Sequence, residues 1–408
     1  MSNSVYEVRK LSSKNIVSPK GYSAAGIHCG IKHKKKDLAI LMSEVPASVA
    51  GVFTTNAVQA APLKVTKEVV YNVGKMQALI VNSGNANACT GKQGVLDAYE
   101  MQKLAADKFG IEPSLVGVAS TGVIGEIMKM EPIRTGVQKL ELGSTLEHGI
   151  DFAQAILTTD TVMKNTTYST IIDGQEVVIS GTAKGSGMIE PNMATMLGFI
   201  TTDANIDSAE LQKALSEITD CTFNSITVDG DTSTNDCVIV MANGLAGNNP
   251  LTPSHPDWSN FYSTLQTVAE DLAKAIARDG EGATKLIEVE VDGAISDEEA
   301  RKIAKTVVGS PLVKTAVFGN DANWGRIIAA VGYSGAKIDP DKISIKIGPA
   351  LMVENGEPVP FSEDELITIL KANEVKIFVS LGQGEGHGFA WGCDLTYDYV
   401  QINASYRS

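Results

Sequence analysis

Residues 184–199 read Lys184-Gly185-Ser186-Gly187-Met188-Ile189-Glu190-Pro191-Asn192-Met193-Ala194-Thr195-Met196-Leu197-Gly198-Phe199. This glycine-rich loop follows residues 177–181, whose alternating apolar positions predict a strand. Within the loop a threonine comes directly after a small residue, at Ala194-Thr195. A strand that ends in a polar, glycine-rich loop is typical of α/β layers, which present such loops at the edge of a sheet.

The segments on either side of this loop alternate between strand and helix patterns. Strands are predicted at 78–81, 116–120, 286–291, 375–380 and 396–402, helices at 146–157, 208–218 and 258–278, and a hairpin turn at Asn355-Gly356. We therefore expect an α/β fold of the layered α+β kind, with mixed sheets sandwiched by helices, and not a regular βαβ series.

The composition sets limits on the class of protein. With 408 residues the chain is long enough for two lobes, and no stretch approaches the roughly 18 apolar residues of a membrane span. The net charge of −14 argues against a nucleic-acid partner. Five cysteines lie far apart without a CxxC pair, which predicts a reducing, cytoplasmic location.

One basic run stands out in this acidic chain, at Lys32-His33-Lys34-Lys35-Lys36. It has no interleaved aromatic residues, which argues against nucleic-acid contact. We interpret it as a solvated turn between two strands.

Thr195 has two interpretations. From composition alone the favoured one is structural, with Thr195 as a cap or a strand residue, Gly185 and Gly187 as turn formers and Lys184 as a surface charge. In the functional one, the Thr195 hydroxyl attacks the Ala194 carbonyl, and hydrolysis of the resulting ester releases a new amino-terminal threonine. Its free α-amine, with an ordinary pKa of roughly 7.7 to 8.0, then serves as the base for its own hydroxyl.

Several motifs in the right order resemble one family, the ornithine acetyltransferases or bifunctional glutamate N-acetyltransferases of arginine biosynthesis, the ArgJ family. The resemblance runs through nearly the whole chain and rests on Asn82-Ser83-Gly84-Asn85-Ala86-Asn87-Ala88, Ser120-Thr121-Gly122-Val123-Ile124-Gly125, Gly185-Ser186-Gly187-Met188-Ile189, Pro191-Asn192-Met193-Ala194-Thr195-Met196-Leu197, Asp229-Gly230-Asp231-Thr232-Ser233-Thr234-Asn235-Asp236 and Asn323-Trp324-Gly325-Arg326.

The resemblance implies a fold and a reaction. The fold would be of the N-terminal-nucleophile kind, cut autocatalytically between Ala194 and Thr195 into an alpha chain of residues 1–194 and a beta chain of residues 195–408. Thr195 would take the acetyl group from N-acetylornithine, release ornithine, and pass the acetyl group to glutamate in ping-pong order. The resemblance further implies a heterotetramer of two alpha and two beta chains.

The resemblance also assigns the remaining site residues. Thr121 and Gly122 match the oxyanion hole, where a hydroxyl and a backbone N–H at a strand end stabilise the tetrahedral oxyanion. The substrate contacts that match are Thr158, Lys184, Thr195, Glu281, Asn403 and Ser408. The family's chains more often end in threonine, and Ser408 keeps the hydroxyl. Taken alone, Lys184 or Glu281 would be an ordinary surface charge.

Neither a metal nor a bound cofactor is expected. Asp229, Asp231, Ser233 and Asn235 have the spacing that opens a calcium loop, but Val240 stands where the closing glutamate is needed. The glycine-rich run at 382–388 lacks the GK[ST] ending of a phosphate loop, and the scattered histidines support no zinc site. Because the family includes members that also accept acetyl-CoA, acetyl-CoA stays open as a co-substrate.

Two alternatives remain from the sequence. A self-processed threonine aminopeptidase or amidohydrolase would use the same nucleophile and hand the acyl group to water. The pair Lys184 and Glu281 favours an amino-acid acceptor instead. A non-catalytic binding protein would have no need of a threonine at position 195.

Overall fold

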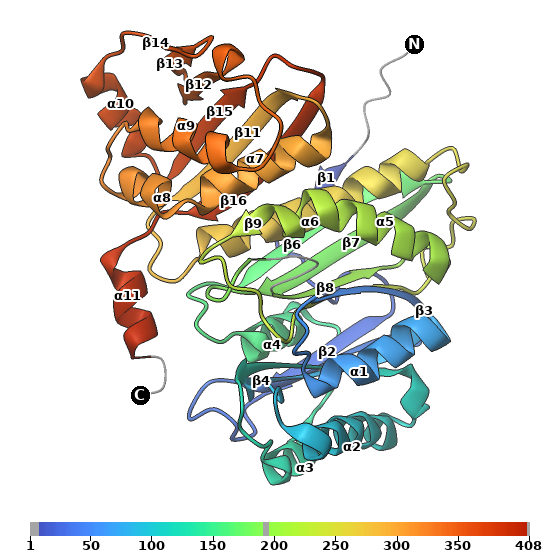
Figure 1. Cartoon of the computed structure of the whole chain (residues 1–408). Coiled ribbons are helices and arrows are strands. Elements are labelled where there is room, and N and C mark those ends of the chain that lie inside the picture. Colours follow the sequence, from blue (N-terminus) through green and yellow to red (C-terminus); the bar gives the residue numbers. More distant parts are fainter. Residues whose placement is uncertain (1–7, 191–195, 406–408) are drawn as a thin grey trace. The chain divides into compact units, whose positions relative to one another are not determined.

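The structure is a computed structural model of the chain, and it describes residues 8–190 and 196–405. The chain divides into two compact units that do not follow chain order (Figure 1). The first comprises Met1–Gly185, Asn192–Thr219 and Thr232–Leu272, and the second comprises Ser186–Pro191, Asp220–Asp231 and Ala273–Ser408.

The first unit is built on a mixed sheet that has nine strands in the described residues. Its order is β1 (Arg9–Lys10), β6 (Lys164–Ile172), β7 (Gln175–Lys184), β8 (Leu197–Thr202), β10 (Cys237–Ala242), β3 (Leu38–Phe53), β4 (Lys75–Asn85) and β5 (Val116–Val123), with β2 (Tyr22–Ile27) also paired to β3. Strands β8 and β10 run parallel to each other, as do β4 and β5, while β7 pairs β8 and β3 pairs β10 in antiparallel fashion.

Helices pack on both faces of this sheet. They are α1 (Ala61–Glu68), α2 (Gly91–Phe109), α3 (Met130–Lys139), α4 (Leu146–Ile156), α5 (Ser208–Cys221) and the part of α6 (Trp258–Arg278) up to Leu272, with short helical turns at Val69–Val73 and Pro113–Leu115. One core cluster joins α1, α2 and α3 to β3, β4 and β5. A second joins α4 to the opposite face, where Leu197, Phe199 and Ile239 of the inner strands lie.

The second unit has its own sheet and core. The sheet order is β14 (Glu357–Pro358), β13 (Ala350–Glu354), β12 (Ser344–Ile347), β15 (Glu374–Ser380), β11 (Leu286–Ala294), β16 (Gly386–Cys393) and β9 (Ile226–Thr227). The helices are α7 (Asp297–Gly309), α8 (Pro311–Phe318), α9 (Trp324–Tyr333), α10 (Glu363–Leu370) and α11 (Tyr397–Ala404), with short turns at Phe223–Ser225 and Pro340–Lys342. The core joins α7, α8, α9 and α10 to β11, β12, β15 and β16.

The layered α/β prediction is confirmed, and most predicted elements exist. Helix α6 has the predicted bounds, and the Asn355-Gly356 turn joins β13 to β14 with a positive φ at both residues. The predicted strand at 396–402 is wrong, because this segment forms α11. The Thr396 hydroxyl accepts the N–H of Tyr399, a helix cap that outweighs the strand-like alternation of the segment.

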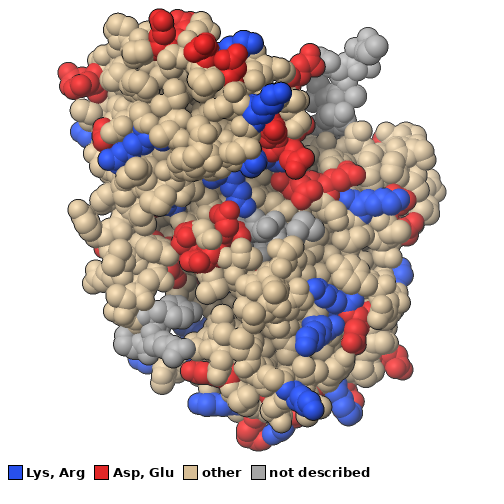
Figure 2. Space-filling model, in the orientation of Figure 1, with Lys and Arg blue, Asp and Glu red and all other residues tan. Residues whose placement is uncertain are grey.

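In the part of the chain that the structure describes, no helix has the length and apolar character needed to cross a bilayer. Acidic residues outnumber basic ones in the chain by 48 to 34, and the face drawn in Figure 2 carries both signs interspersed.

Candidate active site

Thr195 and Ala194 lie outside the described residues, but the structure places the chain that follows them. The carbonyl of Met196 accepts the N–H of Cys237 at 3.0 Å. The next residue, Leu197, opens β8 between two neighbours, opposite Lys184 of β7 and Cys237 of β10. Thr195 is therefore two residues from a position that pairs with Lys184.

The predicted oxyanion pair lies at the end of β5. Thr121 is buried, and Gly122 has φ +133°, a conformation that side chains disfavour. A Cβ atom at Gly122 would also lie 2.3 Å from the carbonyl carbon of Gly84, so that only glycine fits. The Nζ atom of Lys184 donates to Oγ1 of Thr121 at 3.3 Å. The structure thus brings together Thr121 and Lys184, which the sequence assigned to different roles.

Asp160 links the other predicted residues of the first unit. Its Oδ1 atom accepts from Nζ of Lys164 at 2.7 Å and from the N–H of Gly185 at 2.7 Å, and its Oδ2 accepts the N–H of Thr158 at 3.0 Å. Burial disfavours the charged form, but the cations of Lys184 and Lys164 and these hydrogen bonds outweigh it and lower the pKa of Asp160. An ionised Asp160 therefore fixes Thr158 and the backbone beside Lys184.

Asn235 holds the loops that carry the oxyanion pair. It is 5% exposed, and its Nδ2 atom donates to the carbonyl of Ala86 at 2.6 Å and to that of Ser120 at 2.8 Å. Ser120 directly precedes Thr121, so the Asn235 amide ties the end of β5 to the loop after β4. From the sequence, Asn235 was weighed only as part of a calcium-like spacing and Asp160 was assigned no role, since nothing in a linear pattern says which loops meet in space.

The prediction of a solvated turn at 32–36 is wrong for Lys32, which is not fully exposed to solvent. Lys32 is only partly exposed, and its Nζ atom donates to the carbonyl of Leu157 at 2.8 Å, next to Thr158. Burial, opposed by the charge of Asp37, lowers its pKa to about 8. His33, Lys34 and Lys35 are exposed, as a solvated turn requires.

In the second unit the structure brings together Glu281 and Asn403. Glu281 is 6% exposed, and its Oε2 atom accepts from Nδ2 of Asn403 on α11 at 2.8 Å. Its N–H donates to the carbonyl of Ser186 at 2.9 Å, and a Cβ atom at Gly187 would lie 2.4 Å from its Cδ. The Glu281 carboxylate therefore lies against the glycine-rich loop. Ser408 lies outside the described residues.

Asp229, which opens the calcium-like spacing, holds the same loop. Its carboxylate accepts the N–H groups of Met188 and Ile189, each at 2.7 Å, and the hydroxyl of Tyr399 at 3.3 Å. Both carboxylate oxygens therefore accept hydrogen bonds, and Asp229 fixes the backbone at Met188 and Ile189.

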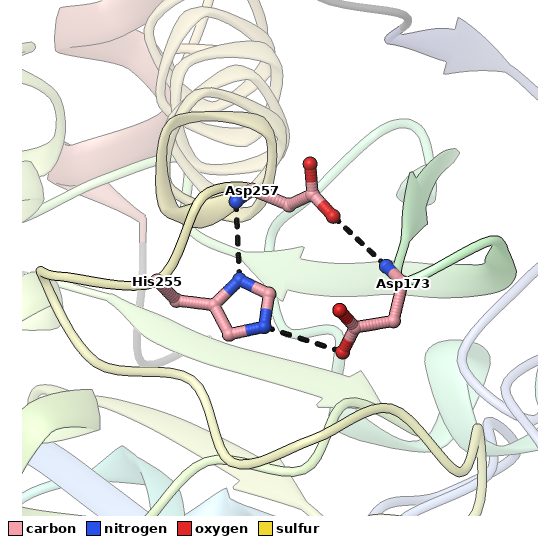
Figure 3. A group of neighbouring side chains, drawn as sticks. All are labelled: Asp173, His255 and Asp257. Carbon is pink, nitrogen blue, oxygen red and sulfur yellow. Dashed lines mark hydrogen bonds and ion pairs between the residues drawn. The ribbon is translucent and has the colours of Figure 1, made fainter.

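A compact group of possible metal ligands lies elsewhere in the first unit, at Asp173, His255 and Asp257 (Figure 3). Nδ1 of His255 accepts the N–H of Asp257 at 3.0 Å, so Nε2 carries the proton that it donates to Asp173 at 3.2 Å. The N–H of Asp173 donates back to Asp257 at 2.8 Å. These bonds tie the β6–β7 turn to the start of α6 with both ring nitrogens already occupied.

Two open depressions lie away from the predicted residues. One, of about 370 Å³, is lined by Glu290, Lys346 and Phe378 on the sheet of the second unit. The other, of about 530 Å³, lies in the first unit between α1 and the start of α2. Neither is lined by a residue that the sequence assigned to the site.

Comparison with known proteins covers almost the whole chain. A model of the ArgJ family matches residues 23–408. The arginine biosynthesis bifunctional protein ArgJ of Geobacillus kaustophilus is 60% identical over 402 residues, which cover 98% of each chain. The protein of the same name from Halalkalibacterium halodurans is 60% identical over 407 residues, covering 100% of this chain and 99% of its own.

A solved structure is also similar. It is a chain of the arginine biosynthesis bifunctional protein ArgJ of Bacillus halodurans, 65% identical, with a TM-score of 0.51. The match covers 100% of that chain but 52% of this one. With the motifs, the layered fold and these full-length relatives all in agreement, the chain belongs to the ArgJ family.

Proposed function

We propose that this chain is a self-processing acetyltransferase of arginine biosynthesis, which moves the acetyl group of N2-acetyl-L-ornithine to L-glutamate through an ester on Thr195. The products are L-ornithine and N-acetylglutamate. Relatives at 60% identity carry the name arginine biosynthesis bifunctional protein, which supports the pathway.

The observation that carries the proposal is the contact between Lys184 and Thr121 in the first unit. Lys184 contacts the Thr121 hydroxyl, and the same Lys184 pairs across β7 and β8 with Leu197, two residues beyond Thr195. An oxyanion donor and a cation are thus in contact where β7 ends, and the chain enters β8 opposite this Lys184. Acyl transfer through a tetrahedral oxyanion requires such a donor close to the nucleophile, which supports Thr195 in that role.

Self-cleavage prepares the nucleophile. The Thr195 hydroxyl adds to the Ala194 carbonyl, the peptide C–N bond breaks to leave an ester, and water hydrolyses the ester to free the Ala194 carboxylate and the Thr195 α-amine. The solved relative supports a cut chain, because it is matched in full and yet spans 52% of this one. Residues 195–408 are 214 of the 408 residues, which is the same share.

Two acyl transfers follow. Thr195 Oγ attacks the acetyl carbonyl of N-acetylornithine, and its proton passes through the α-amine to the departing ornithine nitrogen. The amine of glutamate then attacks the Thr195 ester, and Thr195 recovers its proton. Thr121 and the N–H of Gly122 stabilise the oxyanion in both steps. Thr158, Lys184, Glu281, Asn403 and Ser408 contact the amino acids, and Glu281 and Lys184 supply one charge of each sign.

Acetyl-CoA as a second acetyl donor belongs to the same proposal, in keeping with the word bifunctional in the relatives' name. It would acylate the same Thr195 as a co-substrate, and neither acyl transfer requires a bound cofactor. We also place the enzyme in the cytoplasm, with the alpha and beta chains assembled as a heterotetramer of two each.

Intact mass under denaturing conditions tests the nucleophile. The parent is expected to give two chains that meet at Ala194-Thr195, and the Thr195→Ala variant one inactive chain of 43.1 kDa. Ornithine release from N-acetylornithine, followed by N-acetylglutamate formation on adding glutamate, then tests the reaction. A Thr195→Ala protein that is cut and active would overturn the assignment.

A further inference from the structure

Lys32 occupies a fixed turn between β2 and β3. The turn is organised by Asp37, which is fully buried and accepts the backbone N–H groups of Cys29 at 2.6 Å, Gly30 at 3.2 Å and Lys32 at 2.8 Å. The N–H of Lys32 is one of these donors, so its backbone is fixed in place. Its neighbours at 33–35, in contrast, are exposed to solvent.

The Lys32 side chain runs along the residues of the proposed site in the first unit. Its stem lies on Gly84, where a Cβ atom would be 2.9 Å from Cγ of Lys32. Gly84 pairs in register with Gly122 of the oxyanion pair. The Nζ atom ends on the carbonyl of Leu157, which precedes Thr158.

Burial, together with two neighbouring lysines, disfavours the charged form of Lys32 in the free protein. Burial lowers its pKa most, Lys35 and Lys184 lower it further, and Asp37 and Asp160 raise it, with a result of about 8. A second cation within electrostatic range of Lys184, partly removed from water, is the arrangement expected where an anion binds.

We propose that Lys32 is a substrate-contacting residue that binds a carboxylate of glutamate, as a second cation beside Lys184. The inference rests on the proposed function and adds a basis for recognising the acceptor. Both substrates carry an α-carboxylate, for which one cation suffices. Only glutamate carries a second carboxylate, whereas N-acetylornithine ends in an ammonium group.

Steady-state kinetics of Lys32→Met tests this inference. Loss of a charge-assisted hydrogen bond is expected to raise KM for glutamate roughly 10- to 100-fold. KM for N-acetylornithine should stay within about threefold, since the second cation has no carboxylate of that substrate to bind. Lys34→Met removes the same charge from the exposed part of the same turn and serves as the matched control, with both KM values unchanged.

The pH profile gives a second readout, which a purely structural role would not produce. A lysine with a pKa of about 8 loses its charge as the pH rises through that value, so kcat/KM for glutamate should fall there relative to Lys32→Arg. Arginine stays charged throughout, so that variant should keep glutamate binding and lack this alkaline limb. Should Lys32→Met fail to fold, the comparison of Lys32→Arg with the parent decides alone.

The first half-reaction separates failure of this inference from failure of the proposed function. With N-acetylornithine alone, the parent should release ornithine and retain one acetyl group on the 195–408 chain; if it does not, the proposed function fails. If it does, and Lys32→Met matches the parent in KM for glutamate or loses both substrates equally, the role of Lys32 is overturned.

Discussion

At the scale of single residues, the site of the first unit combines buried charges whose pKa values move in opposite directions. Asp160 meets two lysines and several N–H donors, and these keep it ionised despite burial. Asp236 is 4% exposed, and its Oδ2 atom has no hydrogen-bond partner among the described residues. Burial raises the pKa of Asp236 well above its ordinary value, which the hydrogen bonds of Ser233 and the charge of Lys184 only partly offset.

Asp236→Asn is therefore expected to stabilise the protein above about pH 4. A carboxyl whose pKa is raised by folding binds its proton more tightly in the folded state, so its contribution to stability falls as the pH rises from the unfolded pKa to the folded one. At neutral pH the gain should be about 1–3 kcal/mol, the cost of a buried unsatisfied group. At pH 3 parent and variant should be alike.

Unfolding by urea at several pH values measures this difference. The Thr195→Ala background is suited to it, because an uncut chain keeps the unfolding unimolecular. Asp231→Asn, an exposed carboxylate in the same loop, is the control and should change the free energy of unfolding little. If the difference in free energy of unfolding between Asp236→Asn and the parent does not change with pH, then folding does not raise the pKa of this carboxyl.

At the scale of elements, α11 is a short helix that positions Asn403 against Glu281. No residue within it is buried, so it adds little to the core, yet it carries Asn403, which donates to Glu281. Its first turn is fixed by Thr396, whose hydroxyl donates to the carbonyl of Gly282 at 2.7 Å and accepts the N–H of Tyr399. The helix is thus held mainly at its amino end.

Thr396→Ala should loosen α11 more than it destabilises the protein. Loss of a cap costs about 1 kcal/mol, equivalent to roughly fivefold faster opening. We expect faster hydrogen exchange in α11 and a severalfold higher KM with kcat retained, because Asn403 no longer fixes Glu281. Ser362→Ala removes a similar cap from α10, which carries no proposed substrate contact, and should leave KM unchanged. A changed KM in both variants would contradict the proposal that α11 positions Asn403 against Glu281.

The sequence predicted elements well where a local signal dominated. Helix α6 has an amphipathic pattern 21 residues long, and the Asn355-Gly356 turn combines two residues suited to positive φ. In α11 the alternating tyrosines give a strand-like pattern, but the segment is a helix because Thr396 caps its amino end. Lys32 and Asp160 were missed for a different reason: their hydrogen bonds with Leu157 and Gly185 are set by tertiary packing that no local pattern encodes.

At the scale of the whole molecule, the proposed cut falls inside a sheet to which both products contribute. Strands β8 and β10 come from residues 195–408, while β7 and β3, which flank them, come from residues 1–194. β8 pairs β7 from Leu197 to Thr202, and β10 pairs β3 from Cys237 to Ala242. The core on one face likewise mixes Leu197, Phe199 and Ile239 with residues of both β3 and α4.

The two chains are therefore expected to stay assembled after cleavage. Separation would unpair two inner strand ladders and expose the shared core, so it amounts to unfolding the first unit rather than opening an interface. Native mass measurement should give no free 1–194 chain, and gel filtration of the cut protein should elute both chains together until denaturant unfolds the sheet. The same native mass distinguishes one alpha–beta pair from the proposed heterotetramer. Elution of either chain alone without denaturant would mean that the cut lies elsewhere or that these strands do not bind the products together.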